Sequence, residues 1–186
     1  FDQATGQATI LFYVAMFSPL AFVLIMSFGV NRISYLGLSL LYIAYSVATG
    51  ISLSFILLVY TSSSVSGVFI KSSVVFGIMA VAGYTTKTDL TKFGSLMMML
   101  LVGIIVASIV NFFLHSSGLS MLISYIGVAV FVGLTAYDVQ KLKRIGAGLE
   151  YGDASATTLT YMKDFTIYLD FVNLFLFLLR IFGRRR

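Results

Sequence analysis

The chain has 186 residues, of which 59% are hydrophobic and 10% are charged, and its mean hydropathy is +1.01. Soluble domains carry roughly 25% charged residues, so this composition excludes an ordinary water-soluble protein and indicates an integral membrane protein. Cysteine is absent and histidine occurs once, which excludes disulfides, thiolate sites and multi-histidine metal centres within one chain. The net charge is +5, and the charged residues lie in short clusters between apolar runs. In a membrane protein this pattern indicates the orientation of the chain in the membrane rather than nucleic-acid binding.

Six apolar segments follow one another along the chain, each with about 20 residues or more. At about 1.5 Å per residue, a helix of that length crosses the roughly 30 Å hydrocarbon layer of a bilayer. The sequence lacks the alternation of apolar and polar residues that a membrane barrel strand requires. The predicted transmembrane helices are 8–30, 35–60, 65–84, 93–114, 121–140 and 159–182. We therefore expect a single all-α transmembrane domain over residues 1–186.

The connections between these segments differ in charge. Lysine or arginine occurs after the first, third and fifth segments, whereas connections 61–64 and 115–120 have neither. By the positive-inside rule, the charged connections face the cytoplasm. The last segment poses a conflict, because spanning would carry the basic tail 184–186 to the outer side and folding back would keep it inside. We favour spanning, since charges late in a chain often fail to override the earlier helices.

Small residues recur at four-residue intervals in three of the segments. This spacing lets helix backbones approach each other closely in lipid. The positions are Ala44, Ala48 and Ser52, then Gly103 with Ala107, and Ala129 with Gly133. We expect them to be helix contacts in a compact bundle.

Two carboxylates lie inside the last two segments, at Asp138 and Asp170. Ionisable groups at membrane depth are costly, so their default interpretation is a functional site. Asp138 comes three residues before Lys141 and Asp170 seven after Lys163, which would bring both acids to the inner half of the membrane. Two ionised carboxylates at close range repel, so one would hold a proton and the pair would titrate together. Full ionisation would leave a doubly negative site that suits a hard cation such as calcium.

A purely structural role stays open for each of these acids. Asp138 would pair with Lys141 one turn away, whereas Asp170 has no arginine within two turns. Asn173 lies on the same face as Asp170 and would be either a site member or an interhelical hydrogen bond. Tyr137 flanks Asp138 and would either bond the carboxylate or anchor the helix at the membrane interface.

Three stretches of the chain resemble the Bax inhibitor family, the transmembrane Bax-inhibitor-motif proteins, and most closely its bacterial members. They are VGLTAYDVQKLK at 132–143, LDFVNLFL at 169–176 with LLR just beyond, and YTTKTDL at 84–90. The likeness extends over nearly the whole chain in matching order. It implies a seven-helix bundle whose last helix is central and wrapped by the other six. The six segments would be the second to seventh helices, so the N-terminal part of the full protein would be absent.

The resemblance also implies a function. Family members are described as pH-sensitive calcium leak channels, in which paired aspartates on the last two helices control closure. Those aspartates correspond to Asp138 and Asp170. An arginine on the second helix latches onto the pair in bacterial members, and its counterpart here would be Arg32. Calcium would be a transported or bound ion, and no cofactor is implied.

Two other functions are weighed against the channel. Some bacterial relatives restrain a membrane-anchored AAA protease, so the chain would then be a regulatory subunit on such a protease or another large membrane complex. An intramembrane aspartyl enzyme is disfavoured, because Tyr137 precedes Asp138 but no Gly-x-Gly-Asp motif contains Asp170. We therefore predict a non-enzymatic channel in a bacterial inner membrane, in contact with lipid and without nucleic acid.

Overall fold

The computed structural model describes residues 35–54, 59–148 and 153–184, and for 35, 36, 38, 39 and 153–163 it describes the backbone alone. The regular structure in these ranges is helical, as predicted. The chain divides after Tyr60 into two compact units. The first predicted segment, 8–30, and the predicted gate partner Arg32 lie outside the described residues.

The first unit contributes one described helix, α2, over Tyr35–Ser54. The sequence predicts this helix up to residue 60, and residues 55–58 lie outside the description. Tyr45 and Thr49 are buried one turn apart, so one face of α2 is covered along that turn. The apolar stretch Leu40–Ser54 is shorter than a full membrane span.

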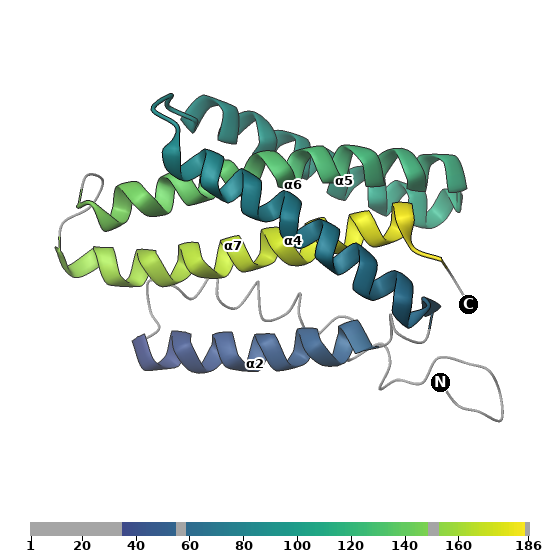
Figure 1. Cartoon of the computed structure of the whole chain (residues 1–186), viewed down its shortest axis with the longest axis horizontal. Coiled ribbons are helices and arrows are strands. Elements are labelled where there is room, and N and C mark those ends of the chain that lie inside the picture. Colours follow the sequence, from purple (N-terminus) through teal and green to yellow (C-terminus); the bar gives the residue numbers. More distant parts are fainter. Residues whose placement is uncertain (1–34, 55–58, 149–152, 185–186) are drawn as a thin grey trace. The chain divides into compact units, whose positions relative to one another are not determined.

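The second unit contains four helices that lie side by side (Figure 1). Each has a stretch long and apolar enough to cross a membrane, which confirms four of the predicted spans within the described residues. The helices are α4 over Ser62–Thr85, α5 over Thr91–Leu114, α6 over Ser117–Gly146 and α7 over Asp153–Phe182. The predicted segments 65–84 and 93–114 agree closely with α4 and α5. Helix α6 extends beyond both predicted ends, whereas α7 begins earlier than predicted and ends at the predicted residue.

Local capping explains the sharp turn between α5 and α6. His115 ends α5 in the left-handed conformation, with φ 50°, and its N–H donates to Asn111 O at 2.9 Å. Ser116 then caps α6, because its hydroxyl oxygen accepts the Leu119 N–H at 3.3 Å. A serine in this position satisfies a backbone donor that the first helical turn leaves open.

Within this unit α6 packs against all three other helices, and α7 packs against α6 and α4. Glycines permit the closest approaches: a Cβ added at Gly83 of α4 would collide with the backbone of Ala136 on α6. Gly133 of α6 faces Met97 and Phe93 of α5, as its small-residue spacing predicts. The outer faces of α4 and α5 expose large apolar side chains, which suits contact with lipid.

The end of α7 lies beside the beginning of α4. The Thr61 N–H donates to Arg184 O at 3.1 Å, and the Arg184 N–H donates to Ser64 Oγ at 2.9 Å. Helix α7 therefore runs the whole length of the bundle, away from its connection to α6 (Figure 1). This arrangement favours the spanning alternative. The expectation that α7 is surrounded by six other helices stays a prediction.

Candidate buried acid site

The structure buries both aspartates that the sequence singles out. Asp138 on α6 and Asp170 on α7 each expose only 3% of their surface. Among the buried residues that the structure describes, these two are the ones that can carry a full charge. A solvated surface role is therefore excluded for both, and the cost of burying a charge applies to each.

The register of α6 against α7 follows from two stacked rings. The centroids of Phe131 on α6 and Phe177 on α7 are 5.8 Å apart, with an interplanar angle of 30°. Asp138 lies seven residues after Phe131, and Asp170 lies seven residues before Phe177, on helices that run in opposite directions. Seven residues make about two helical turns, or about 10.5 Å, and return to nearly the same face. This register predicts that both acids lie at one level along the α6–α7 contact.

The neighbours of the two acids along their own helices are closed to solvent. Leu134 and Thr135 precede Asp138 in α6 and are buried, and Leu174, one turn after Asp170, is completely inaccessible. The Thr135 hydroxyl donates to Phe131 O at 2.7 Å, so this polar group is satisfied within its own helix. Burial from bulk solvent strengthens electrostatic interactions at these positions.

The residues predicted to interact with Asp138 and Asp170 make other contacts in the structure. The Asn173 amide nitrogen donates to Leu169 O at 2.9 Å, within its own helix. The Tyr137 ring covers Gly94 of α5. Lys141, weighed above as an ion-pair partner of Asp138, has its Nζ 5.9 Å from the centroid of that same ring. The roles of Asn173 and Tyr137 at the gate stay predictions.

The structure contains a buried polar clamp just beyond Asp138 that the sequence did not predict. Gln140 is 6% exposed and reaches from α6 to the connection between α4 and α5. Its Oε1 accepts the Leu90 N–H at 2.9 Å, and its Nε2 donates to Thr88 O at 2.7 Å. One side chain thereby satisfies two backbone groups that neither helix can satisfy.

Two basic residues continue this clamp along α6. The Lys143 Nζ donates to Tyr84 O at 2.7 Å and lies 4.8 Å from the centroid of the Tyr84 ring. The Arg144 Nη2 lies 3.1 Å from Asp89 Oδ1. We call Gln140, Lys143 and Arg144 the inner clamp. The sequence offers one signal for it: Gln140, Lys143 and the target connection lie in stretches of family resemblance, and Arg144 follows directly after one of them.

Asp89 also binds the first residue of α5. Its Oδ1 accepts hydrogen bonds from the Thr91 hydroxyl at 2.6 Å and from the Thr91 N–H at 2.9 Å. These bonds, with a smaller contribution from the Arg144 guanidinium, lower the pKa of Asp89 below its ordinary value of 3.8. The connection between α4 and α5 therefore has a fixed shape and an ionised carboxylate at neutral pH.

The described residues contain no group of three or more histidine, aspartate or glutamate side chains that would hold a metal ion. Calcium takes six to eight oxygen ligands in proteins. Two carboxylates alone would supply at most part of such a shell.

These features define an integral membrane protein, all-helical in the described residues, that encloses two acidic side chains in its interior. Residues 2–186 match the family described as Bax1-I, Inhibitor of apoptosis-promoting Bax1. The chain belongs to this family, which confirms the resemblance seen in the three sequence stretches.

Curated bacterial proteins extend the match over most of the chain. It is 46% identical over 170 residues to the "Inner membrane protein YbhL" of Escherichia coli (strain K12), which covers 91% of this chain and 73% of that protein. It is 44% identical over 182 residues to an uncharacterized protein of Rickettsia prowazekii (strain Madrid E), covering 98% of this chain and 75% of that protein. The name of the first relative agrees with the membrane predicted for this chain.

Proposed function

We propose that the protein is a pH-sensitive leak for calcium or a similar cation in the bacterial inner membrane, gated by Asp138 and Asp170. The observation that carries the proposal is the burial of both acids on two packed helices, each two turns from the Phe131–Phe177 contact. Membership in the Bax inhibitor family supports the same assignment. Buried acids with no function would be costly to keep.

In the closed state the two carboxylates share one proton. An O–H···O⁻ hydrogen bond of this kind is short and strong, and it would join α6 to α7 at mid-bundle. Loss of the proton replaces that bond with two negative charges, whose repulsion at about 4 Å amounts to roughly 4 kcal/mol at an effective dielectric constant near 20. The contact between the helices would loosen as the pH rises, and the leak would open.

The same chemistry selects the ion. Two ionised carboxylates supply at most four oxygens, so a calcium ion between them would keep part of its water shell. Such incomplete coordination suits an ion in transit, because complete coordination would trap it. The inner clamp supports this function by fixing α6 just beyond Asp138, so that the motion is confined to the contact with α7.

Calcium flux in liposomes tests the proposal. We expect flux through the unmodified protein to rise between about pH 6 and about pH 8, and we expect Asp138→Asn with Asp170→Asn to abolish that pH response. Asp164→Asn is the matched control, because it removes an exposed acid of α7 that lies outside both the buried site and the inner clamp. If the double variant keeps both the flux and its pH response, the gate assignment fails.

A second function, regulation of a membrane-anchored AAA protease or another large membrane complex, has one supporting observation. The connection between α4 and α5 exposes Lys87, Thr88 and Asp89 while the inner clamp holds its backbone in place. A rigid, charged loop is a suitable docking element. Purification of the tagged protein from its native membrane tests this role. A stoichiometric partner that is lost on changing Lys87 and Asp89 to alanine would support it.

A further inference from the structure

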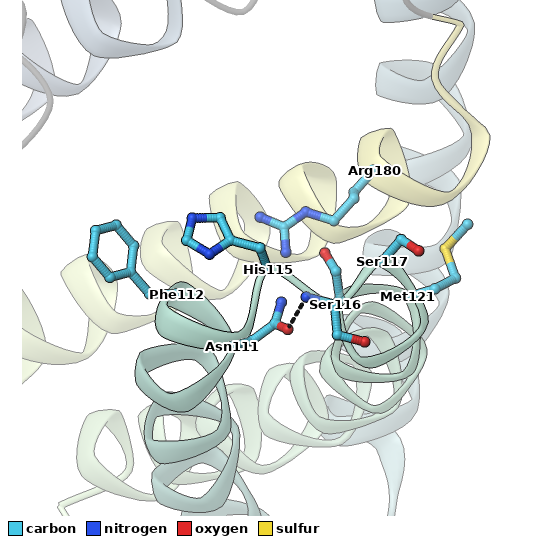
Figure 2. Close-up of a pocket in the computed structure, with 8 residues that line it drawn as sticks. Asn111, Phe112, His115, Ser116, Ser117, Met121 and Arg180 are labelled. Atoms are coloured by element: carbon cyan, nitrogen blue, oxygen red, sulfur yellow. Dashed lines mark hydrogen bonds between the residues drawn. The ribbon is translucent and has the colours of Figure 1, made fainter.

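An open cleft lies at the end of the bundle opposite the inner clamp. Its volume is about 570 Å³, and it is bounded by the end of α5, the beginning of α6 and the last turn of α7 (Figure 2). Its polar lining consists of Asn111, His115, Ser116, Ser117, Ser120 and Arg180. The charge pattern of the sequence assigns this end to the outer side of the membrane.

The cleft contains one cationic side chain among its described lining residues. Figure 2 shows the Arg180 side chain extending from α7 over the cleft, on the side where the His115 ring lies. Among the residues that the structure describes, no aspartate or glutamate lines the cleft. The ion pair found there joins Arg144 to Asp89 at the other end of the bundle, so no described carboxylate neutralises Arg180. Its guanidinium carbon lies 6.0 Å from the centroid of the Phe177 ring.

Neutral polar groups line the same cleft as Arg180. Three serines line the cleft, and the Ser116 N–H donates to Asn111 Oδ1 at 3.1 Å, a bond that orients the Asn111 amide (Figure 2). Ser117 is the first residue of α6, so its N–H group has no acceptor within the helix. Hydroxyl groups and a guanidinium together form the donor set with which proteins hold phosphate oxygens.

The rim of the cleft is apolar. Phe112 is 73% exposed and Met121 is 40% exposed, and both line the cleft beside its polar residues. His115 follows directly on the span of α5, so the cleft lies at the depth where lipid headgroups meet the hydrocarbon. A polar pocket with an apolar rim at that depth matches a molecule that carries both a phosphate and acyl chains.

We propose that Arg180 binds a phosphate group in this cleft. The phosphate belongs either to an anionic phospholipid of the outer leaflet or to soluble inorganic phosphate. The guanidinium would hold two phosphate oxygens in its planar fork, and the serine hydroxyls would hold a third. This site is separate from the buried acids and does not depend on the proposed leak.

Binding measured by native mass spectrometry of the delipidated protein in detergent tests the proposal. Three probes are compared: phosphatidylglycerol, diacylglycerol, which has the same acyl chains without phosphate, and inorganic phosphate. We expect phosphatidylglycerol to bind more tightly than diacylglycerol, and Arg180→Gln to weaken it about tenfold. The affinity of Arg180→Lys for phosphatidylglycerol should lie between those of the unmodified protein and Arg180→Gln, because lysine keeps the charge but lacks the planar fork of the guanidinium.

Lys71→Gln is the matched control, because Lys71 is an exposed cation on α4 whose Nζ lies over the Phe182 ring, outside the cleft. Phosphatidylglycerol binding that inorganic phosphate does not displace assigns the site to lipid. Displacement by inorganic phosphate assigns it to the soluble ion. Equal binding of phosphatidylglycerol and diacylglycerol, or equal losses in Arg180→Gln and Lys71→Gln, overturns the proposal.

Discussion

The two ends of the α4–α7 bundle are held together in different ways. At the inner end, three side chains of α6 reach across to the connection between α4 and α5: Gln140, Lys143 and Arg144. At the outer end, the turn between α5 and α6 is stabilised by local bonds, and an open cleft separates it from α7. Helix α6 is therefore fixed at its inner end, whereas the cleft beside its outer end leaves room for a ligand.

Glycine contacts repeat this contrast. Near the inner end, a Cβ at Gly83 would collide with the backbone of Ala136, which cannot move without its helix. Nearer the outer end, a Cβ at Gly127 would meet the Phe177 ring at 2.7 Å, a side chain that can turn aside in part. The two contacts therefore differ in how far they can yield.

Gly83→Ala should give the largest loss of stability, about 3 kcal/mol in the free energy of unfolding, because α4 and α6 must separate to admit the new atom. Gly127→Ala should cost about 1 kcal/mol. Gly77→Ala is the control on α4, since its new Cβ would have nothing within 4 Å. Thermal unfolding in detergent measures all three, and equal losses at Gly83 and Gly127 would erase the contrast between the ends.

Gln140→Leu should have the next largest effect, a loss of about 2 kcal/mol in the free energy of unfolding. The substitution leaves the partly buried Leu90 N–H and Thr88 carbonyl without their hydrogen-bond partner. The most specific readout is hydrogen exchange at the Leu90 amide, which should become about tenfold faster. Lys143→Gln removes an exposed contact from the same clamp and should change that amide less. Unchanged exchange in Gln140→Leu would mean that the clamp does not fix the loop.

Asp89→Ala should have the smallest effect, a slight fall in the unfolding temperature, because its carboxylate is exposed. Since the pKa of Asp89 is lowered by folding, its stabilisation is present above the ordinary value of 3.8 and is lost as the pH falls through the lowered value. The difference between the unmodified protein and Asp89→Ala should thus vanish in acid. Thr91→Ala should raise the pKa of Asp89 more than Arg144→Gln, in the order of their contributions.

The sequence predicts those parts of the fold that depend on composition along one helix. Apolar length alone locates α4 and α5 to within a few residues, and an acid inside an apolar stretch predicts the buried positions of Asp138 and Asp170. Both inferences need no knowledge of neighbouring helices. Their physical basis is the cost of polar groups at membrane depth.

Contacts between residues that are far apart in the chain could not be predicted from the sequence. The hydrogen bonds of Gln140 join residues 50 and 52 positions apart, and nothing local distinguishes Gln140 from a solvated glutamine. Small-residue spacing predicts the contact of Gly133 correctly but fails elsewhere. Gly103 fits the predicted packing pattern yet has open space among the described residues, whereas Gly83 makes a close contact outside that pattern. Which face of a helix meets its neighbour depends on the assembled bundle.

The central claim is that Asp138 and Asp170 face each other, and cysteine cross-linking tests it most directly. The chain has no cysteine of its own, so Asp138→Cys with Asp170→Cys introduces the sole pair. The control pairs Asp138→Cys with Phe171→Cys, because the Phe171 ring packs against Phe69 and Phe76 of α4 at 5.6 and 5.3 Å. We predict that oxidation or mercuric ion bridges the first pair and leaves the control pair open. Bridging of the control pair alone, or of neither pair, would contradict the account.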